Sequence, residues 1–326
     1  MFKRFRLLLA WGLILEGCSM PRPAQLVIAE HLLSGAPDIS TDQLVFHFAQ
    51  GNQEAMLAKT ASYRDFRTQY KEYNRQILAP FGYSLTDDKS ESGASGYFSI
   101  YRGDQLIAKD VMYMAPVSLN ASQTDFIGLP SFSDGAHLFT RSKFELDQFW
   151  VATKIPFAYV GDRILYLEIW EVSPGVSRLQ AYLDNQRVFD DQFNNVSTYS
   201  AFDGPWAYGD HWALDILDAK PDGQQGWNPY DRLIQDGQDV NILKGYQNSF
   251  QFAVLTGRPF YFFQKDGKIG ISFDGQEIPR GYDEIPHYGC CTPSLLNPGL
   301  SMNMVWFFAR RGSHWYYVEA YVPIRP

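Results

Sequence analysis

The sequence is short of the residues from which chemical centres are most often built. Among its 326 residues there are three cysteines and six histidines, and charged residues make up only 20%. So few cysteines cannot supply the disulfide framework of a small secreted domain, so a hydrophobic core has to hold the fold. The chain also has no Gly-x-Ser-x-Gly elbow, and no cysteine and histidine in the order of papain-like proteases. These absences argue against the common hydrolase classes.

Positive charge is also in deficit. There are 28 Lys and Arg residues against 36 Asp and Glu residues, which gives a formal net charge of -8. Nucleic acids and anionic lipid headgroups attract an excess of positive charge, so the composition excludes both as partners. Aromatic residues, by contrast, reach 16% in a chain that is 45% hydrophobic. This composition is typical of a globular protein and favours strands.

Long apolar runs are missing except at the N-terminus. Basic residues there precede the apolar stretch 7–15, which is too short to span a bilayer and is typical of a signal peptide. The following Leu-Glu-Gly-Cys resembles the bacterial lipoprotein signal, which implies cleavage after residue 17 and lipidation of Cys18. Glu16 departs from that signal. Plain secretion is therefore the alternative to a lipid anchor on the cell envelope.

The rest of the chain divides by composition. Residues 18–40 contain several prolines and glycines and are expected to form a tether after the signal peptide of residues 1–17. Residues 41–80 are predicted to be helical, because 62–78 carries aromatic residues at steps of three and four. Beyond that point, residues 81–326 alternate short aromatic or β-branched runs with turn residues, which is typical of strands.

Two elements recur in this β region. The first is an aromatic strand, a glycine turn and a second aromatic strand. The second is a tight hairpin with a glutamine just past the turn, whose Asp, Asn and Gly residues tolerate the positive φ of two-residue turns. The aromatic copies begin at Phe157, Trp206, Phe252 and Val305, and the glutamines are Gln105, Gln186, Gln238 and Gln276.

Together these elements make units of four short strands in about 50 residues, the size of a β-propeller blade. The last unit lacks a glutamine hairpin, and the first, 97–110, lacks an aromatic pair. We expect the two to complete one blade from both ends of the chain. With a degenerate copy in 125–146, the fold expected is a mainly β, antiparallel, five-bladed propeller-like domain. A β-sandwich or an open stack of repeats is the alternative.

One stretch carries a resemblance to a known repeat. Residues 266–285, DGKIGISFDGQEIPRGYDEI, resemble the bacterial WG repeat, with Ile269 in place of the namesake tryptophan. The C-terminal half resembles exported bacterial proteins with such segments. WG repeats are linked to binding and envelope roles, so the resemblance implies a binding role and no defined reaction.

The insertion after this repeat holds the sharpest candidate for chemistry. His287, Cys290 and Cys291 offer imidazole and thiol groups that suit Zn²⁺ or Cu⁺. Adjacent cysteines chelate a single ion poorly, however, and the three residues are one ligand short of a closed zinc site. A vicinal disulfide, simple buried thiols and a metal site remain open. No cofactor is predicted.

Other side chains are candidates for contact with a ligand. Asp283 and Glu284 are neighbours, so on a strand they would point to opposite faces and would make a poor acid–base pair. Trp227 and Tyr230 lie in an acidic loop, 217–241, and could stack on a sugar ring. His287 and the adjacent Tyr288 complete the predicted ligand-facing set.

The sequence therefore predicts a lipid-anchored, exported binding module without enzymatic activity. Its expected partner is a glycan, a peptide or an envelope protein. The alternative is an exported hydrolase, or a redox or metal-binding protein, centred on His287, Cys290 and Cys291.

Overall fold

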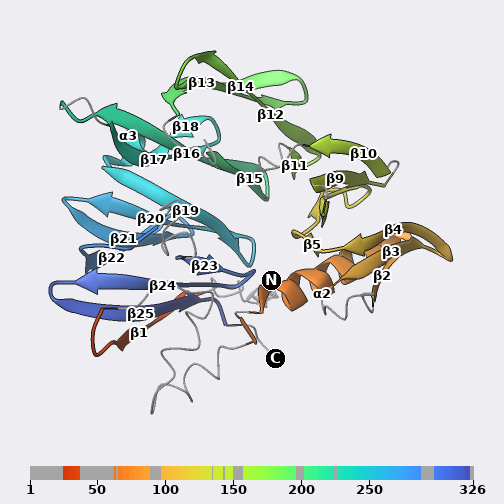
Figure 1. Ribbon diagram of the computed structural model, residues 1–326, viewed down its shortest axis with the longest axis horizontal. Coiled ribbons are helices and arrows are strands. Elements are labelled where there is room, and N and C mark those ends of the chain that lie inside the picture. Colours follow the sequence, from red (N-terminus) through yellow and green to blue (C-terminus); the bar gives the residue numbers. More distant parts are fainter. Residues whose placement is uncertain are drawn as a thin grey trace, which may run out of the picture.

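The protein is mainly β and its sheets are antiparallel (Figure 1). A computed structural model describes residues 25–36, 62–63, 65–88, 97–133, 135–141, 144–149, 157–195, 202–223, 227–287 and 297–323. Within these ranges the strands form six sheets, and Figure 1 shows them following one another in chain order around the molecule. No helix in the same ranges has the length and apolar character to cross a bilayer.

Three successive stretches each form a four-stranded sheet with its strands in sequence order. The first holds β11 (Phe157–Val160), β12 (Arg163–Ser173), β13 (Val176–Leu183) and β14 (Gln186–Asn194). The second holds β15 (Phe202–Tyr208), β16 (His211–Pro221), β17 (Trp227–Gln235) and β18 (Gln238–Asp239). The third holds β19 (Asn248–Leu255), β20 (Arg258–Lys265), β21 (Lys268–Phe273) and β22 (Gln276–Tyr282).

The predicted hairpins are confirmed in these sheets. Each aromatic pair forms the first two strands, as in β15 and β16, where Tyr208 pairs with His211 across the turn. Each glutamine opens the fourth strand, as where Gln238 pairs with Gln235. The turn between those two residues has φ of 51° at Asp236 and 79° at Gly237, so its sequence is explained by the backbone geometry.

The N-terminal part of the β region forms two less regular sheets. The first holds β2 (Tyr83–Asp87), β3 (Phe98–Arg102) and β4 (Gln105–Val111). The second holds β5 (Tyr113–Met114), β6 (Ser118–Leu119), β7 (Phe126–Gly128), β8 (Pro130–Phe132), β9 (Gly135–Thr140) and β10 (Phe144–Phe149). The degenerate copy expected in 125–146 therefore belongs to a sheet of its own.

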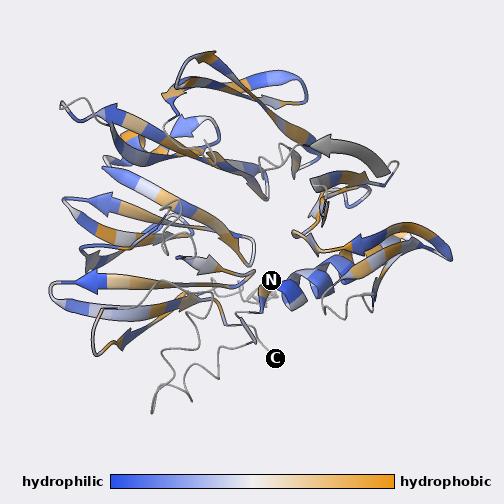
Figure 2. Ribbon diagram, in the orientation of Figure 1, coloured by the Kyte–Doolittle hydropathy of each residue, from blue (hydrophilic) through white to orange (hydrophobic). Residues whose placement is uncertain are grey.

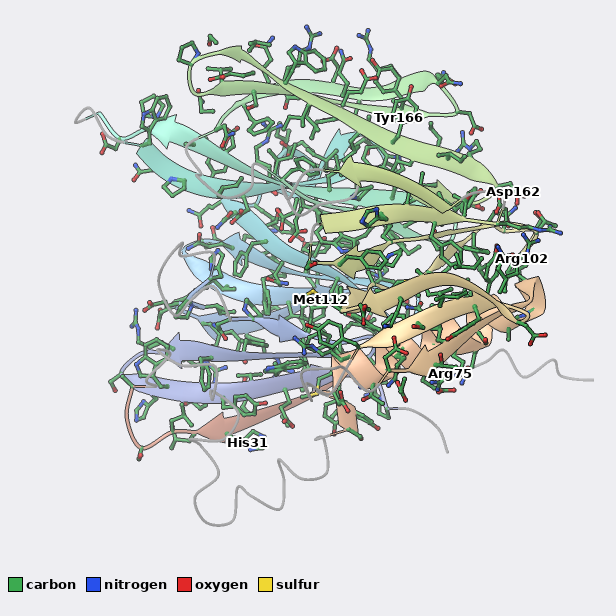
Figure 3. All side chains as sticks on the ribbon, turned by 45° about the vertical axis from the view of Figure 1, so that its right-hand side comes forward. His31, Arg75, Arg102, Met112, Asp162 and Tyr166 are labelled. Carbon is green, nitrogen blue, oxygen red and sulfur yellow. The ribbon has the colours of Figure 1, made fainter. Side chains whose placement is uncertain are left out.

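The last sheet combines the two ends of the described chain. It holds β23 (Gly299–Leu300), β24 (Met304–Arg311), β25 (His314–Tyr321) and, antiparallel to β25, β1 (Val27–Leu32). His31 of β1 lies at the lower edge of the molecule in Figure 3. The ends of the chain therefore meet, as expected, but through a different segment from the one expected, 97–110.

One expectation is corrected by this sheet. Residues 27–32 are a strand and not part of a tether, because VIAEHL supplies enough β-forming residues for a six-residue ladder between flanking prolines and glycines. The described residues form six sheets where five blades were expected, so the number of blades stays a prediction. The strands at 27–32 and 83–87 carry neither of the two recurring elements. The sequence therefore did not predict that these segments belong to sheets.

Apolar side chains pack between consecutive sheets. The cluster around Leu165 and Ile216 joins the β11–β14 and β15–β18 sheets, and the cluster around Phe262 and Phe307 joins the β19–β22 sheet to the last one. Strands inside the sheets are buried on both faces, which is why β21 is buried from Ile269 onward with no alternation. Figure 2 shows hydrophobic residues along the strands and hydrophilic ones at many turns.

The helical part described is α2 (Phe66–Leu78), followed by the single 3₁₀ turn of Ala79–Phe81. Asp65 caps α2 by accepting a hydrogen bond from the Thr68 amide. Its buried side includes Asn74, which donates to the Met114 carbonyl and accepts from the Val117 amide. This polar anchor fixes α2 against the second sheet. The rest of the predicted helical segment, 41–61, lies outside the described residues.

Candidate functional site

A pocket opens where the sheet β15–β18 is incomplete. Strand β17 pairs with β16 over its whole length, but β18 pairs only with Ile234 and Gln235. Asp239 then caps the short helix α3 (Val240–Lys244) by accepting a hydrogen bond from the Ile242 amide, at 3.0 Å. The helix turns the chain away from the sheet, so most of the outer edge of β17 has no neighbouring strand.

Side chains protect this edge instead of a strand. The Asp231 amide donates to Asn248 Oδ1 at 2.7 Å, and the Leu233 amide donates to Ser249 Oγ at 3.0 Å. Asn241 of α3 donates to the Asp231 carbonyl at 2.8 Å. Pro229 lies two residues further along the same edge, where a proline loses no ladder hydrogen bond. The edge is therefore closed to a further strand in this region.

Arg232 is the central charged residue of the pocket. Its guanidinium reaches three carboxylates, with 2.5 Å to Asp191, 3.1 Å to Asp218 and 2.9 Å to Asp239. Burial alone would lower the pKa of Arg232, but the hydrogen bonds and charges of these carboxylates outweigh it and raise the pKa. Since Asp191 lies on β14, the cluster also ties two sheets together.

Tyr230 and Lys220 stand beside this cluster. The Tyr230 hydroxyl donates to Asp218 at 3.0 Å, and burial together with this bond raises the pKa of Tyr230 to about 12. The Lys220 ammonium lies 4.0 Å from the centre of the Tyr230 ring, a cation–π contact. Within the described residues Lys220 makes no ion pair.

The opposite wall comes from α3 and the segment after it. The Tyr246 ring stacks on Phe263 with 4.7 Å between centroids, and its hydroxyl donates to Glu277 at 2.8 Å. Gln247 accepts from the Gly267 amide through its Oε1, at 2.7 Å. Ile242 projects into solvent with 81% of its surface exposed, unusual for an aliphatic side chain.

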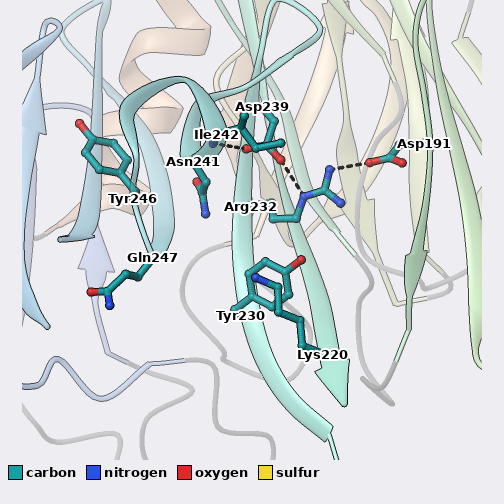
Figure 4. Close-up of a pocket in the computed structure, with 9 residues that line it drawn as sticks. All are labelled: Asp191, Lys220, Tyr230, Arg232, Asp239, Asn241, Ile242, Tyr246 and Gln247. Atoms are coloured by element: carbon teal, nitrogen blue, oxygen red, sulfur yellow. Dashed lines mark hydrogen bonds and ion pairs between the residues drawn. The ribbon is translucent and has the colours of Figure 1, made fainter. Parts of the chain in front are cut away.

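The cavity between these walls has a volume of about 450 Å³, within the usual range for small-molecule sites. Figure 4 shows Tyr230 and Lys220 on one side and Tyr246 and Gln247 on the other, with the Arg232 guanidinium turned towards Asp191. Except for Lys220, its polar side chains are held in place by internal hydrogen bonds, and its apolar parts are one aliphatic and two aromatic side chains. Such a lining can orient a ligand without reorganising.

The structure separates the two aromatic residues expected to stack on a sugar. Trp227 and Tyr230 are three residues apart on β17, whose register with β16 is unbroken, so they point to opposite faces. Tyr230 lines the pocket. Trp227 is 49% exposed and lies outside it.

His287 lies on the other side of β17 from the pocket. Its ring stacks on Phe250 at 3.7 Å, and Nδ1 donates to the Ile285 carbonyl at 2.6 Å. The other nitrogen, Nε2, is 3.5 Å from the buried carboxylate of Asp231. The described contacts of His287 are thus those of an anchored side chain with one acidic neighbour.

Asp283 and Glu284 bind separate partners. Asp283 accepts hydrogen bonds from Lys268 and from the Gly312 amide, and the Lys268 contact is the main reason that its pKa is lowered. Glu284 pairs with Arg310 at 2.9 Å. Both carboxylates therefore connect the end of β22 to the last sheet, and they do not converge on one point.

The remaining predicted residues lie outside the described ranges: Cys18, Tyr288, Cys290 and Cys291. Within the described ranges there is no group of three or more His, Cys, Asp or Glu side chains that could hold a metal ion.

Sequence reasoning missed most of the pocket. Asp218 and Asp239 stood out as acidic residues, but their cation is Arg232 of the same sheet. Lys220 and Asp191 gave no sequence signal, because they come from different strands and, for Asp191, from a different sheet. One signal was present in the sequence. Side chains two residues apart on a strand point to the same face, which would have placed Tyr230 and Arg232 together.

No family model and no curated protein matches the sequence. Among solved structures, the chain is similar to the β-propeller domain of the trilobed protease from Pyrococcus furiosus, with a TM-score of 0.36. The identity is 12%, over 74% of this chain and 78% of that one.

Two acylaminoacyl peptidases also match, each with a TM-score of 0.32 and 13% identity. One was solved in complex with Z-Gly-Gly-Phe-chloromethyl ketone, and the match covers 70% of this chain and 41% of that one. The other is from Pyrococcus horikoshii, and the match covers 75% of this chain and 44% of that one. The chain thus spans less than half the length of either enzyme. Similarity at this level assigns neither a fold nor an activity.

Proposed function

We propose that the protein is an exported, lipid-anchored binding module with a propeller-like arrangement of six blades, and that it binds its ligand in the Arg232 pocket. The observation that carries the binding role is the preorganised lining of that pocket. Arg232, with three carboxylate partners, and Tyr230, bonded to Asp218, hold fixed positions at a cavity of ligand size.

The propeller-like arrangement is supported by three features of the sheets. They follow one another in chain order, their cores lie between consecutive sheets, and β1 pairs with the C-terminal strand β25. Six lies within the usual range of about 4–8 blades. Pairing the two ends of the chain removes an exposed sheet edge.

Export and lipid anchoring are supported by the N-terminal sequence alone. A basic start, a short apolar stretch and Cys18 follow the order of a lipoprotein signal. The anchor would hold the domain at a membrane surface, where a binding module meets glycans, peptides and envelope proteins.

Binding is tested with the full-length protein in detergent against panels of oligosaccharides and peptides. Lys220→Gln and Ile242→Asp change the pocket, and Trp227→Ala changes the opposite face of β17 as a control. We expect a ligand whose binding is weakened by the first two variants and unaffected by the third. Turnover of an envelope substrate by a protein that binds nothing would overturn the proposal.

One contact favours the alternative of an exported hydrolase, or of a redox or metal-binding protein, near His287, Cys290 and Cys291. The His287 Nε2 lies 3.5 Å from the Asp231 carboxylate, a pairing that could orient an imidazole for proton transfer. If this alternative holds, His287→Gln abolishes an activity that Lys220→Gln leaves unchanged.

A further inference from the structure

The charges of the Arg232 pocket nearly cancel, because Arg232 and Lys220 lie beside the three carboxylates of Asp191, Asp218 and Asp239. Arg232 is only 13% exposed, and its three carboxylate partners are between 7% and 34% exposed. An ionic ligand that bound Arg232 or one of these carboxylates would have to displace an existing partner and leave that charge unpaired. The cluster therefore disfavours ionic ligands of either sign.

The polar groups that remain can serve a ligand that both donates and accepts hydrogen bonds. Among the described residues, the Lys220 ammonium has only an aromatic contact and Gln247 bonds only through its Oε1, so both keep donors for a ligand. The carboxylates of Asp191 and Asp239 keep lone pairs beyond the bonds that they accept. Hydroxyl groups match such a mixture, since each of them can donate and accept.

Apolar surface accompanies these polar groups. Ile242 is 81% exposed at the rim, and the half-buried Tyr230 forms part of the lining. A sugar ring presents C–H groups on its faces and hydroxyls around its edge, so one ligand could cover Ile242 and reach the polar groups together. The cavity of about 450 Å³ has room for a mono- or disaccharide.

A peptide fits this place less well. Peptides commonly bind at sheet edges by adding a strand through backbone hydrogen bonds. Here the edge groups at Asp231 and Leu233 are already bonded to Asn241, Asn248 and Ser249. Pro229 supplies no amide at the next position on that edge.

We infer that the pocket recognises a neutral carbohydrate. This inference rests on the proposed binding function and names its ligand class. Lys220 and Gln247 donate to ring hydroxyls, Asp191 and Asp239 accept from them, and Ile242 covers an apolar face of the sugar.

The test is calorimetric titration of the full-length protein in detergent with matched sugars. Diacetylchitobiose and cellobiose are neutral. Deacetylated chitobiose is the cationic counterpart, and the uronic acid form of cellobiose is the anionic one. We expect at least one neutral sugar to bind more tightly than its charged counterpart, with an affinity that hardly changes between about 0.05 and 0.5 M salt.

Variants show whether binding occurs in this pocket. We expect Lys220→Gln to weaken binding of the neutral sugar about tenfold, because it removes a charged hydrogen-bond donor. Gln247→Ala is expected to weaken it by less, and Trp227→Ala to leave it unchanged. Neutral sugar binding that survives both pocket variants would overturn the inference by placing the site elsewhere.

Failure of this inference can be told apart from failure of the binding function. Preference for a charged sugar, or for a peptide whose binding Lys220→Gln weakens, overturns the carbohydrate class and keeps the pocket as a binding site. If neither the sugars nor a peptide panel bind and Lys220→Gln has no effect, both the inference and the binding function of this pocket fail.

Discussion

At the scale of single residues, Arg232 is expected to have a large effect on stability. Replacing it with methionine leaves Asp191, Asp218 and Asp239 close together without their shared cation. Removing one partner from a buried ion pair costs about 3–5 kcal/mol, so the free energy of unfolding of Arg232→Met should fall by about that amount. Urea unfolding followed by tryptophan fluorescence measures it.

Arg178→Met is the matched control. Arg178 also binds a carboxylate through two nitrogens, at 2.7 Å each to Asp190, but the pair is on the surface. Surface pairs contribute less than buried ones, so this variant should lose much less stability than Arg232→Met. Equal losses in the two variants would contradict the role given to burial around Arg232.

The carboxyl group of Asp190 predicts how stability depends on pH. The hydrogen bonds from Arg178 are the main reason that the pKa of Asp190 falls to about 2, below its ordinary value of 3.8. A carboxyl with a lowered pKa in the folded state stabilises the protein above its unfolded pKa, and this contribution is lost as the pH falls. The gap in unfolding midpoint between wild type and Asp190→Asn should therefore be present at pH 6 and should vanish towards pH 2.

Asp104→Asn serves as the comparison for that titration. Asp104 lies on the exposed β3–β4 turn and forms no ion pair within the described residues. Its variant loses no ion pair, so it should unfold close to the wild type. A gap for Asp190→Asn that stays constant from pH 6 to pH 2 would rule out the titration of Asp190 as its cause.

At the scale of elements, β1 decides how the last sheet is completed. Its six residues pair with β25, and Ile28 packs against the core shared with the β19–β22 sheet. Glu30 holds the strand through Arg311 and the Tyr282 hydroxyl. Burial would raise the pKa of Glu30, but these bonds outweigh it and lower the pKa, so the carboxylate stays ionised.

Removing β1 should therefore destabilise the domain. A chain that begins at Leu33 loses the ladder and the Glu30 contacts and exposes the edge of β25, at a cost on the order of 3 kcal/mol. It should also associate through that edge. Thermal unfolding and size-exclusion chromatography measure both effects, with a chain that begins at Gln25 as the control. If the shorter chain is as stable and monomeric as the control, β1 is dispensable.

At the scale of the whole molecule, the repeat pattern was readable from the sequence, but the pairing of β1 with β25 was not. Gln186, Gln238 and Gln276 mark fourth strands because two-residue turns demand particular residues just before them. The strands β1 and β2 have ordinary compositions; β1 pairs with the distant β25, and β2 pairs with the next strand, β3. The described residues therefore form six sheets where the sequence predicted five blades.

The pocket, too, could be predicted from the sequence only in part. Tyr230 was recognisable as an aromatic residue in an acidic loop, but the pocket itself arises because β18 ends after two residues and most of β17 has no hydrogen-bonded strand on that side. Asp191 meets Arg232 only because two sheets pack together. Contacts between repeats depend on three-dimensional packing that no single segment encodes.

The lipid anchor gives the last prediction at this scale. If Cys18 is lipidated, only the residues up to Val27 separate the membrane from β1, a reach on the order of 30 Å at most. The domain would then sit close to the membrane with β1 as its attachment. Wild-type protein should partition into the detergent phase and incorporate labelled palmitate, while Cys18→Ser should be released and soluble. Cys290→Ser should behave as the wild type, because its thiol lies far along the chain from the signal. A soluble wild type, or a Cys18→Ser variant that remains with the membrane, would show that this cysteine is not the anchor.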